Sequence, residues 1–211
     1  MRDDSQDNSD ELGGTNPSPT AFVRTALVFY GVLGCVALVW RMSRPGDSIL
    51  RPAAAMAEPA WGLVPALAAG LGVGLVAVAA SELLTRFTSL GDALADLLGE
   101  SLAGIGRADA VLLALASGLA EEMFFRGALQ PAVGLVWASL IFGACHFLPR
   151  REMALWSLYA AVMGFVFGLL FEQTGRLVAP VVAHVAVNAI NLPRLARRAE
   201  ARLQPPTTQD D

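Results

Sequence analysis

The chain alternates long apolar stretches with short polar ones, and six of the apolar stretches approach the length of a membrane-spanning helix. A bilayer core about 30 Å thick takes about 20 helical residues. On that measure we predict spans at residues 21–40, 60–80, 109–130, 131–147, 153–171 and 177–192. An even number of spans would leave both chain ends on the same side of the membrane.

The segment 81–107 follows a different pattern. Its leucines and Phe87 recur at steps of three and four residues, with acidic and basic residues between them. This periodicity is typical of an amphipathic helix, which we expect to lie on the membrane surface or against the bundle. The sequence therefore predicts an all-α integral membrane protein: a bundle of about six transmembrane helices plus one amphipathic interfacial helix.

Composition supports this fold class. Of the 211 residues, 55% are hydrophobic and only 16% are charged, whereas soluble domains usually carry about a quarter charged residues. Residues 1–20 are acidic and rich in polar residues, so we expect a disordered tail. Residues 193–211 are basic and then polar, so we expect a solvated tail. No basic patch is interleaved with aromatic residues, which argues against nucleic-acid binding.

The arginines indicate an orientation. Those of the C-terminal tail would share one side of the membrane with the Arg150–Arg151 loop, Arg86 and Arg107. Cytoplasmic loops carry an excess of basic residues. We therefore expect both termini in the cytoplasm.

A few ionisable or strongly polar residues fall inside the predicted spans. An unpaired charge at the bilayer centre costs about 3 kcal/mol on insertion scales, so such residues face a bundle interior and are functional candidates. The candidates are Glu121, Glu122, Arg126, His146, His184, Asn188 and Asn191.

Helix geometry sorts these candidates. Residues four apart share a helix face, whereas adjacent residues diverge by about 100°. Glu122 and Arg126 are thus placed to form an ion pair, and Glu121 points away from it. On the same rule His184 and Asn188 lie on one helix face and project into the same space. Phe142 lies one turn before His146 and can form a wall of the pocket around its imidazole.

These residue types form a hydrolytic set. Glu121 is suited to act as general base toward a water molecule that His146 helps to hold. His184 and Asn188 can donate hydrogen bonds to an oxyanion that develops on a carbonyl. The alternative is a metal site, because Glu121, His146 and His184 are also the ligand types of a catalytic zinc ion. The spacing is not HExxH, so the sequence does not demand zinc.

Three ordered motifs point to a known family. The sequence EEMFFR (121–126) matches EExxxR, FGACH (142–146) matches FxxxH, and HVAVN (184–188) matches HxxxN. In this order they resemble the CPBP family of intramembrane proteases, also called the Abi or CAAX prenyl protease 2-like family. The resemblance covers residues 108–192, which would form a catalytic core of four spans. Residues 21–107 would add two spans and the amphipathic helix.

The resemblance implies a membrane endopeptidase. Glu121 would be the glutamate base, His146 its water-positioning partner, and His184 with Asn188 the oxyanion site. Glu122 and Arg126 would support them, as would Phe142 and Asn191, although an asparagine at position 191 is more often an interhelical clamp.

Family members have been described both as metalloproteases and as glutamate-type proteases, and we expect the second type, without a cofactor; zinc is the alternative. The expected partners are membrane lipids and a membrane-associated peptide or protein substrate, of CAAX or bacteriocin-like type. The expected location is a bacterial or archaeal cell membrane. A different class of function stays open as well: a non-catalytic membrane scaffold or immunity protein.

Overall fold

The computed structural model describes residues 18–44, 48–51 and 60–203. Within these residues every regular element is a helix, and there is no strand. The predicted all-α fold is therefore confirmed. Most of the predicted N-terminal tail, and residues 204–211 of the predicted C-terminal tail, lie outside the described residues.

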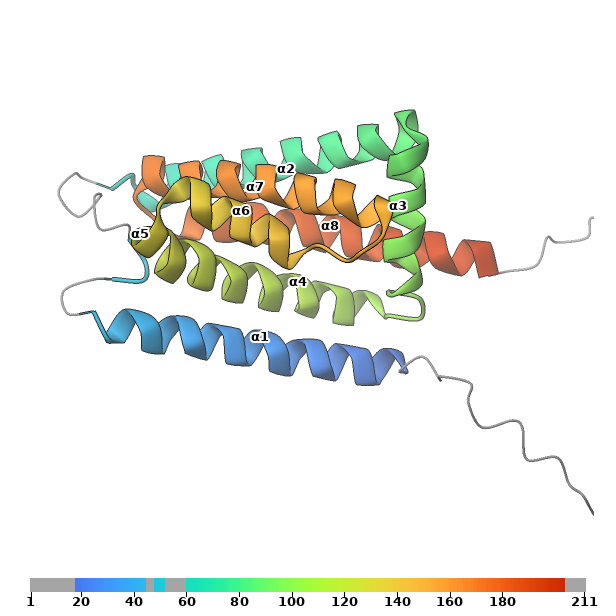
Figure 1. Cartoon of the computed structure of the whole chain (residues 1–211), viewed down its shortest axis with the longest axis horizontal. Coiled ribbons are helices and arrows are strands. Elements are labelled where there is room, and N and C mark those ends of the chain that lie inside the picture. Colours follow the sequence, from blue (N-terminus) through green and yellow to red (C-terminus); the bar gives the residue numbers. More distant parts are fainter. Residues whose placement is uncertain (1–17, 45–47, 52–59, 204–211) are drawn as a thin grey trace, which may run out of the picture.

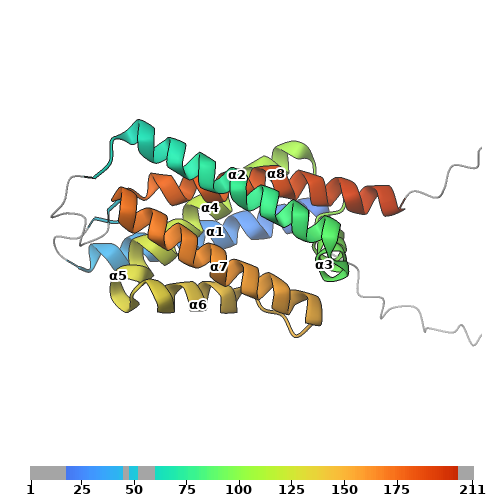
Figure 2. The same cartoon turned by 90° about the horizontal axis from the view of Figure 1, so that it is seen from above.

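Six long or medium helices run side by side, and one helix crosses an end of the bundle (Figures 1 and 2). In chain order the elements are α1 (Pro19–Met42), α2 (Leu63–Phe87), α3 (Ser89–Glu100), α4 (Arg107–Glu122), the π-helix η2 (Met123–Leu129), α5 (Gln130–Val133), α6 (Leu135–Cys145), α7 (Arg151–Thr174) and α8 (Val178–Leu203). The start of α1 and the end of α8 lie at the same end of the bundle as α3 (Figure 1).

Four of the described helices, α1, α2, α7 and α8, are long and apolar enough to cross a membrane, by length and composition. The predicted count of six spans is thus not exact. The third predicted span, residues 109–130, forms α4, η2 and α5 in succession and carries three charged side chains near its middle. The fourth, residues 131–147, contains α6, which has only 11 residues. Gly134, whose φ is 84°, separates α5 from α6.

The predicted amphipathic helix over residues 81–107 is wrong in its bounds. The second span does not end at residue 80, because α2 continues to Phe87. Thr88 then adopts an extended conformation, and its side chain caps α3 by accepting a hydrogen bond from the Gly91 N–H. The amphipathic element is therefore α3 alone, which packs across the bundle rather than spanning it. A Cβ on its Gly99 would lie 2.8 Å from the Leu195 carbonyl oxygen of α8, so glycine permits this close crossing.

The expected end of the last span at Pro193 is also wrong. Helix α8 continues through Pro193 to Leu203, so residues 193–203 are helical and not a solvated tail. An interior proline costs a helix about 3 kcal/mol. Ion pairs to α3 hold the extension: Arg198 bonds Asp92 and Asp96, and Arg202 approaches Asp96 to 2.5 Å. The sequence analysis missed these pairs because they join segments about a hundred residues apart.

Small residues set the distance of α8 from its neighbours. Gly70 of α2 lies so close to Ala179 that a Cβ would collide with that residue's carbonyl. On α4, a Cβ at Gly118 would lie 2.7 Å from Cγ2 and 3.0 Å from the backbone nitrogen of Val185. Such contacts let helices pack closely in an apolar surrounding. They place α8 against both α2 and α4.

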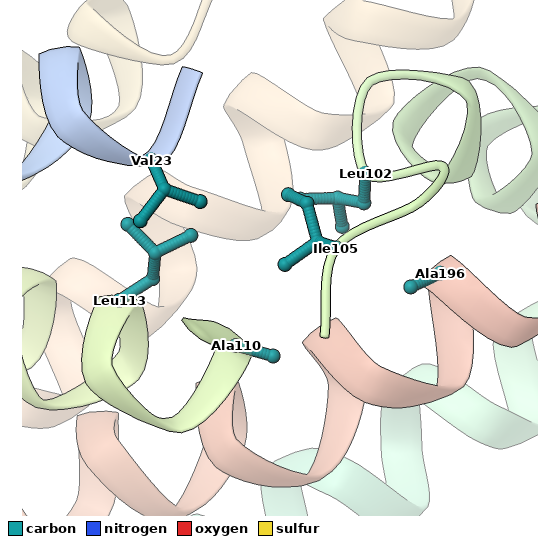
Figure 3. Close-up of a cluster of buried hydrophobic side chains, with 6 residues drawn as sticks. All are labelled: Val23, Leu102, Ile105, Ala110, Leu113 and Ala196. Atoms are coloured by element: carbon teal, nitrogen blue, oxygen red, sulfur yellow. The ribbon is translucent and has the colours of Figure 1, made fainter. Parts of the chain in front are cut away.

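A second packing centre ties the N-terminal helix to this core. Figure 3 shows a cluster of buried side chains from α1, from the connection between α3 and α4, from α4 itself and from α8. Its members are Val23, Leu102, Ile105, Ala110, Leu113 and Ala196. The cluster fixes α1 beside α4, the helix that ends with Glu121 and Glu122.

Candidate active site

Three of the predicted residues meet between the helices. Glu121 comes from the last turn of α4, His146 caps the C-terminus of α6, and His184 lies on α8. The Oε2 atom of Glu121 is 4.0 Å from Nε2 of His146 and 3.9 Å from Nε2 of His184. The structure therefore brings this carboxylate close to both imidazoles.

His146 is oriented by its own helix. Its Nδ1 atom lies 2.7 Å from the carbonyl oxygen of Phe142, one turn earlier. A carbonyl only accepts, so Nδ1 carries a proton, and Nε2 faces Glu121. The ring of Phe142 packs 4.6 Å from the imidazole, centroid to centroid, which is the predicted pocket wall.

Glu122 is the centre of a buried polar network. Its side chain is fully buried, and its Oε1 accepts hydrogen bonds from Arg126 at 2.9 Å and from Nδ1 of His184 at 2.8 Å. The predicted Glu122–Arg126 ion pair thus forms. The contact with His184 was not predicted, because the two residues lie on helices far apart in the sequence.

Arg126 extends the network to α7. Its second terminal nitrogen donates to the Gly164 carbonyl at 3.0 Å, and its guanidinium lies 4.6 Å from the centre of the Phe142 ring. Arg126 belongs to the π-helix η2, which begins directly after Glu122. The sequence analysis assumed α-helical geometry here and missed this change. Short π-helical segments are frequent at functional sites.

The two asparagines of α8 have different surroundings. Asn188 donates from Nδ2 to the Ser117 hydroxyl of α4 at 2.9 Å. Asn191 donates to the Ser81 hydroxyl of α2 at 3.2 Å and joins α8 to that helix. A carboxamide has two N–H groups. Asn188 thus has one N–H held by Ser117 and a second one for another acceptor.

The polar residues open into one cavity of about 1090 Å³. Glu121, His146, His184 and Asn188 line one part of it. Apolar side chains from α1, α3, the connection between α3 and α4, α4 and α8 line much of the rest, among them Phe22, Leu94, Leu102, Leu113, Leu192 and Leu195. Asp92, Arg194 and Arg198 add charge where the cavity reaches α3.

Two cavity residues were missed by the sequence analysis. Trp156 of α7 packs against His146 with ring centroids 5.7 Å apart. Tyr30 of α1 lines the same cavity as Glu121. Neither residue belongs to a motif, and no spacing rule relates residues of separate helices.

The donor set was tested for a metal. Glu121, His146 and His184 are suitable ligand types, and both imidazoles have their Nδ1 atoms engaged, as is common for metal-bound histidine. Tetrahedral zinc with bonds of about 2.0–2.2 Å brings neighbouring ligand atoms to roughly 3.4 Å of each other. The observed separations of 3.9 and 4.0 Å are wider. Among the described residues no group of three such side chains is spaced to hold a metal ion.

The fold and site together define a helical membrane protein with an acid–imidazole–amide cluster between its helices. Residues 105–190 match the sequence model of the family described as type II CAAX prenyl endopeptidase Rce1-like. This segment is similar to that family, and the resemblance derived from the three motifs is confirmed.

A relative is similar over part of the chain. It is the uncharacterized protein YpbD of Bacillus subtilis (strain 168), 44% identical over 82 residues. The alignment covers 38% of this chain and 42% of YpbD. No solved structure matches the chain.

Proposed function

We propose that the protein is an intramembrane endopeptidase in which Glu121 activates a water molecule for attack on a peptide carbonyl. The observation that carries the proposal is the approach of Glu121 Oε2 to two imidazole Nε2 atoms, at 4.0 and 3.9 Å. These separations exceed a direct hydrogen bond and suit groups bridged by one water molecule. The family of residues 105–190 supports the same class of activity.

The proposed water step uses Glu121 and His146. With the His146 ring neutral and its Nδ1 bonded to the Phe142 carbonyl, a water molecule would donate one hydrogen to the Glu121 carboxylate and the other to Nε2 of His146. Its oxygen lone pair would then be directed at the substrate carbonyl. As the C–O bond forms, the water proton passes to Glu121, which later returns it to the leaving amine.

The proposed oxyanion site uses His184 and Asn188. When doubly protonated, His184 donates from Nδ1 to Glu122 and presents Nε2–H to the cavity. The buried cluster then contains two negative and two positive charges, carried by Glu121, Glu122, Arg126 and His184. Its net charge is zero, which costs least in an apolar surrounding. The second N–H of Asn188 would be the other donor, with its carboxamide oriented by Ser117.

The proposed substrate is a membrane-associated peptide with a hydrocarbon segment. The apolar lining of the cavity next to the polar cluster supports this class. A prenylated CAAX peptide meets the requirement and agrees with the description of the matched family.

The test is cleavage by the purified full chain in liposomes, using membrane-anchored peptides that carry or lack a prenylated cysteine. General-base catalysis contributes about 10²–10⁴-fold to a rate. We therefore expect Glu121→Ala to lower the cleavage rate by at least about a hundredfold, with helical content unchanged by circular dichroism. A folded Glu121→Ala variant that cleaves at the wild-type rate would contradict the proposal.

The zinc mechanism and the scaffold role are separated by two further measurements. We expect chelator-treated protein to stay active while metal analysis shows no bound zinc; loss of activity that zinc restores would favour the metalloprotease. A scaffold or immunity protein would retain its cellular phenotype in Glu121→Gln and His184→Ala variants, whereas an enzyme would lose it.

A further inference from the structure

Tyr30 reaches the proposed general base from outside the family segment. It lies on α1, whereas the family match begins at residue 105. Its half-buried side chain lines the cavity that contains Glu121, and its hydroxyl interacts electrostatically with that carboxylate. The proposed mechanism assigns no task to Tyr30.

The packing of α1 places this side chain independently. Gly34 lies one turn after Tyr30 and therefore on the same face of α1. A Cβ on Gly34 would be in ordinary contact, at 3.9 Å, with the Cβ of Ala120. Ala120 directly precedes Glu121, so the face of α1 that carries Tyr30 lies against the end of α4. The cluster around Val23 and Leu113 fixes the same helix pair two turns away.

The two oxygens of Glu121 have different surroundings. Oε2 is buried, has no hydrogen-bond partner among the described residues, and faces both imidazoles. A carboxylate on a helix has several rotamers, and a hydrogen bond from a fixed donor selects one of them. A tyrosine hydroxyl is a suitable donor, because its rigid ring is held by packing.

We propose that Tyr30 is a positioning residue whose hydroxyl donates a hydrogen bond to Glu121 and keeps Oε2 directed at His146 and His184. Its effect on turnover rests on the proposed function, whereas the hydrogen bond itself does not. Helix α1 is then part of the site rather than only an anchor, because it supplies a side chain that orients the base.

The hydrogen bond can be tested without measuring activity. The chain has two tyrosines, Tyr30 and Tyr159, so Tyr159→Phe leaves Tyr30 as the only tyrosine. In ultraviolet resonance Raman spectra of this variant, the tyrosine Fermi doublet reports whether the hydroxyl donates a strong hydrogen bond. We expect a donor-type intensity ratio that is lost when Glu121→Ala is added. A ratio that does not change on Glu121→Ala overturns the inference, whether or not the protein is a protease.

The consequence for turnover is tested with Tyr30→Phe, which keeps the ring and removes the hydroxyl. Losing part of the stabilisation that a hydrogen bond gives to a charged group lowers a reaction rate by about tenfold. We expect kcat to fall about tenfold with KM near that of wild type, since the substrate is bound by other residues.

Tyr159→Phe is the matched control. It removes a hydroxyl from the same cavity, but one that donates at 3.1 Å to the Ala77 carbonyl and not to Glu121. The inference requires a larger fall in kcat for Tyr30→Phe than for Tyr159→Phe. Equal kcat values for Tyr30→Phe and wild type would overturn the positioning role, and a Glu121→Ala variant that still cleaves would overturn the proposed function instead.

Discussion

The two adjacent glutamates have separate tasks because a helix turns by about 100° between them. Glu122 faces inward and bonds both Arg126 and His184, while Glu121 faces the cavity with Oε2 unbonded within the described residues. The sequence analysis predicted this division from the spacing of Arg126 alone. It did not predict that His184 shares the Glu122 oxygen, because that contact depends on how α8 packs against α4.

This division predicts that replacing glutamate with glutamine lowers stability at position 122 and activity at position 121. Glu122→Gln removes the negative charge beside buried Arg126, and breaking a buried ion pair costs about 3–5 kcal/mol of the free energy of unfolding. We expect a clearly lower melting temperature in detergent, followed by circular dichroism. The matched variant Glu121→Gln should melt close to wild type yet lose cleavage. Equal melting temperatures for the two variants would show that Glu122 is not the structural partner.

At the scale of elements, glycines decide how closely the helices that carry the site approach each other. Gly118 of α4 lies against the Val185 backbone, directly beside His184 on α8 and one turn before Glu122. The π-helix η2 follows, and a Cβ on its Gly127 would lie 2.5 Å from Cγ1 of Ile49. The sequence analysis predicted apolar helices here but not which helix faces pack together. Small residues favour close contact between helices but do not specify which helix makes the contact.

We expect Gly118→Ala to separate α4 from α8. Its new Cβ would lie 2.7 Å from a Val185 methyl and 3.0 Å from backbone, and overpacking of this kind costs about 1–3 kcal/mol. The cleavage rate should fall as Glu121 moves from His184. The control is Gly72→Ala on α2, whose Cβ would meet nothing within 4 Å; melting temperature and rate should stay near wild type. If the two alanine variants behave alike, the close contact does not position the site.

At the scale of the whole molecule, α3 closes one end of the bundle, where the cavity reaches charged residues (Figure 1). Arg198 of α8 donates to Asp92 of α3, and this hydrogen bond lowers the pKa of Asp92 below its ordinary value of 3.8. A carboxyl group with a lowered folded-state pKa stabilises the fold above its unfolded-state pKa. That contribution is lost as the pH falls through the folded-state value.

We therefore expect the melting temperature of wild type to fall as the pH is lowered below about 4. Asp92→Asn should show a smaller dependence over the same range. The effect should be modest and should shrink at high salt, because these side chains are partly exposed. Asp109→Asn, on the first turn of α4, is the control and should keep the wild-type dependence. An identical pH dependence in Asp92→Asn would exclude this pair as the cause.

The sequence by itself determined the helical fold class, the helical nature of each apolar stretch, the Glu122–Arg126 pair and the three motifs of the family segment. These features depend on short-range spacing, which the 3.6-residue period of a helix fixes. The positions at which helices end were less determined. Pro193 is locally a helix-terminating signal. The helix continues through it because Arg198 and Arg202 form ion pairs with acidic residues of α3.

Only the tertiary structure decided which helix faces meet. The hydrogen bond from His184 to Glu122 and the hydrogen bond from Asn188 to Ser117 each join helices that are distant in the chain. The cavity that Tyr30 and Glu121 both line is likewise formed by separate helices. Their geometry follows from where glycines allow backbones to approach, a property of two surfaces at once. Helices α4, α6 and α8 carry the chemical groups, and the packing of these helices against one another brings the groups together.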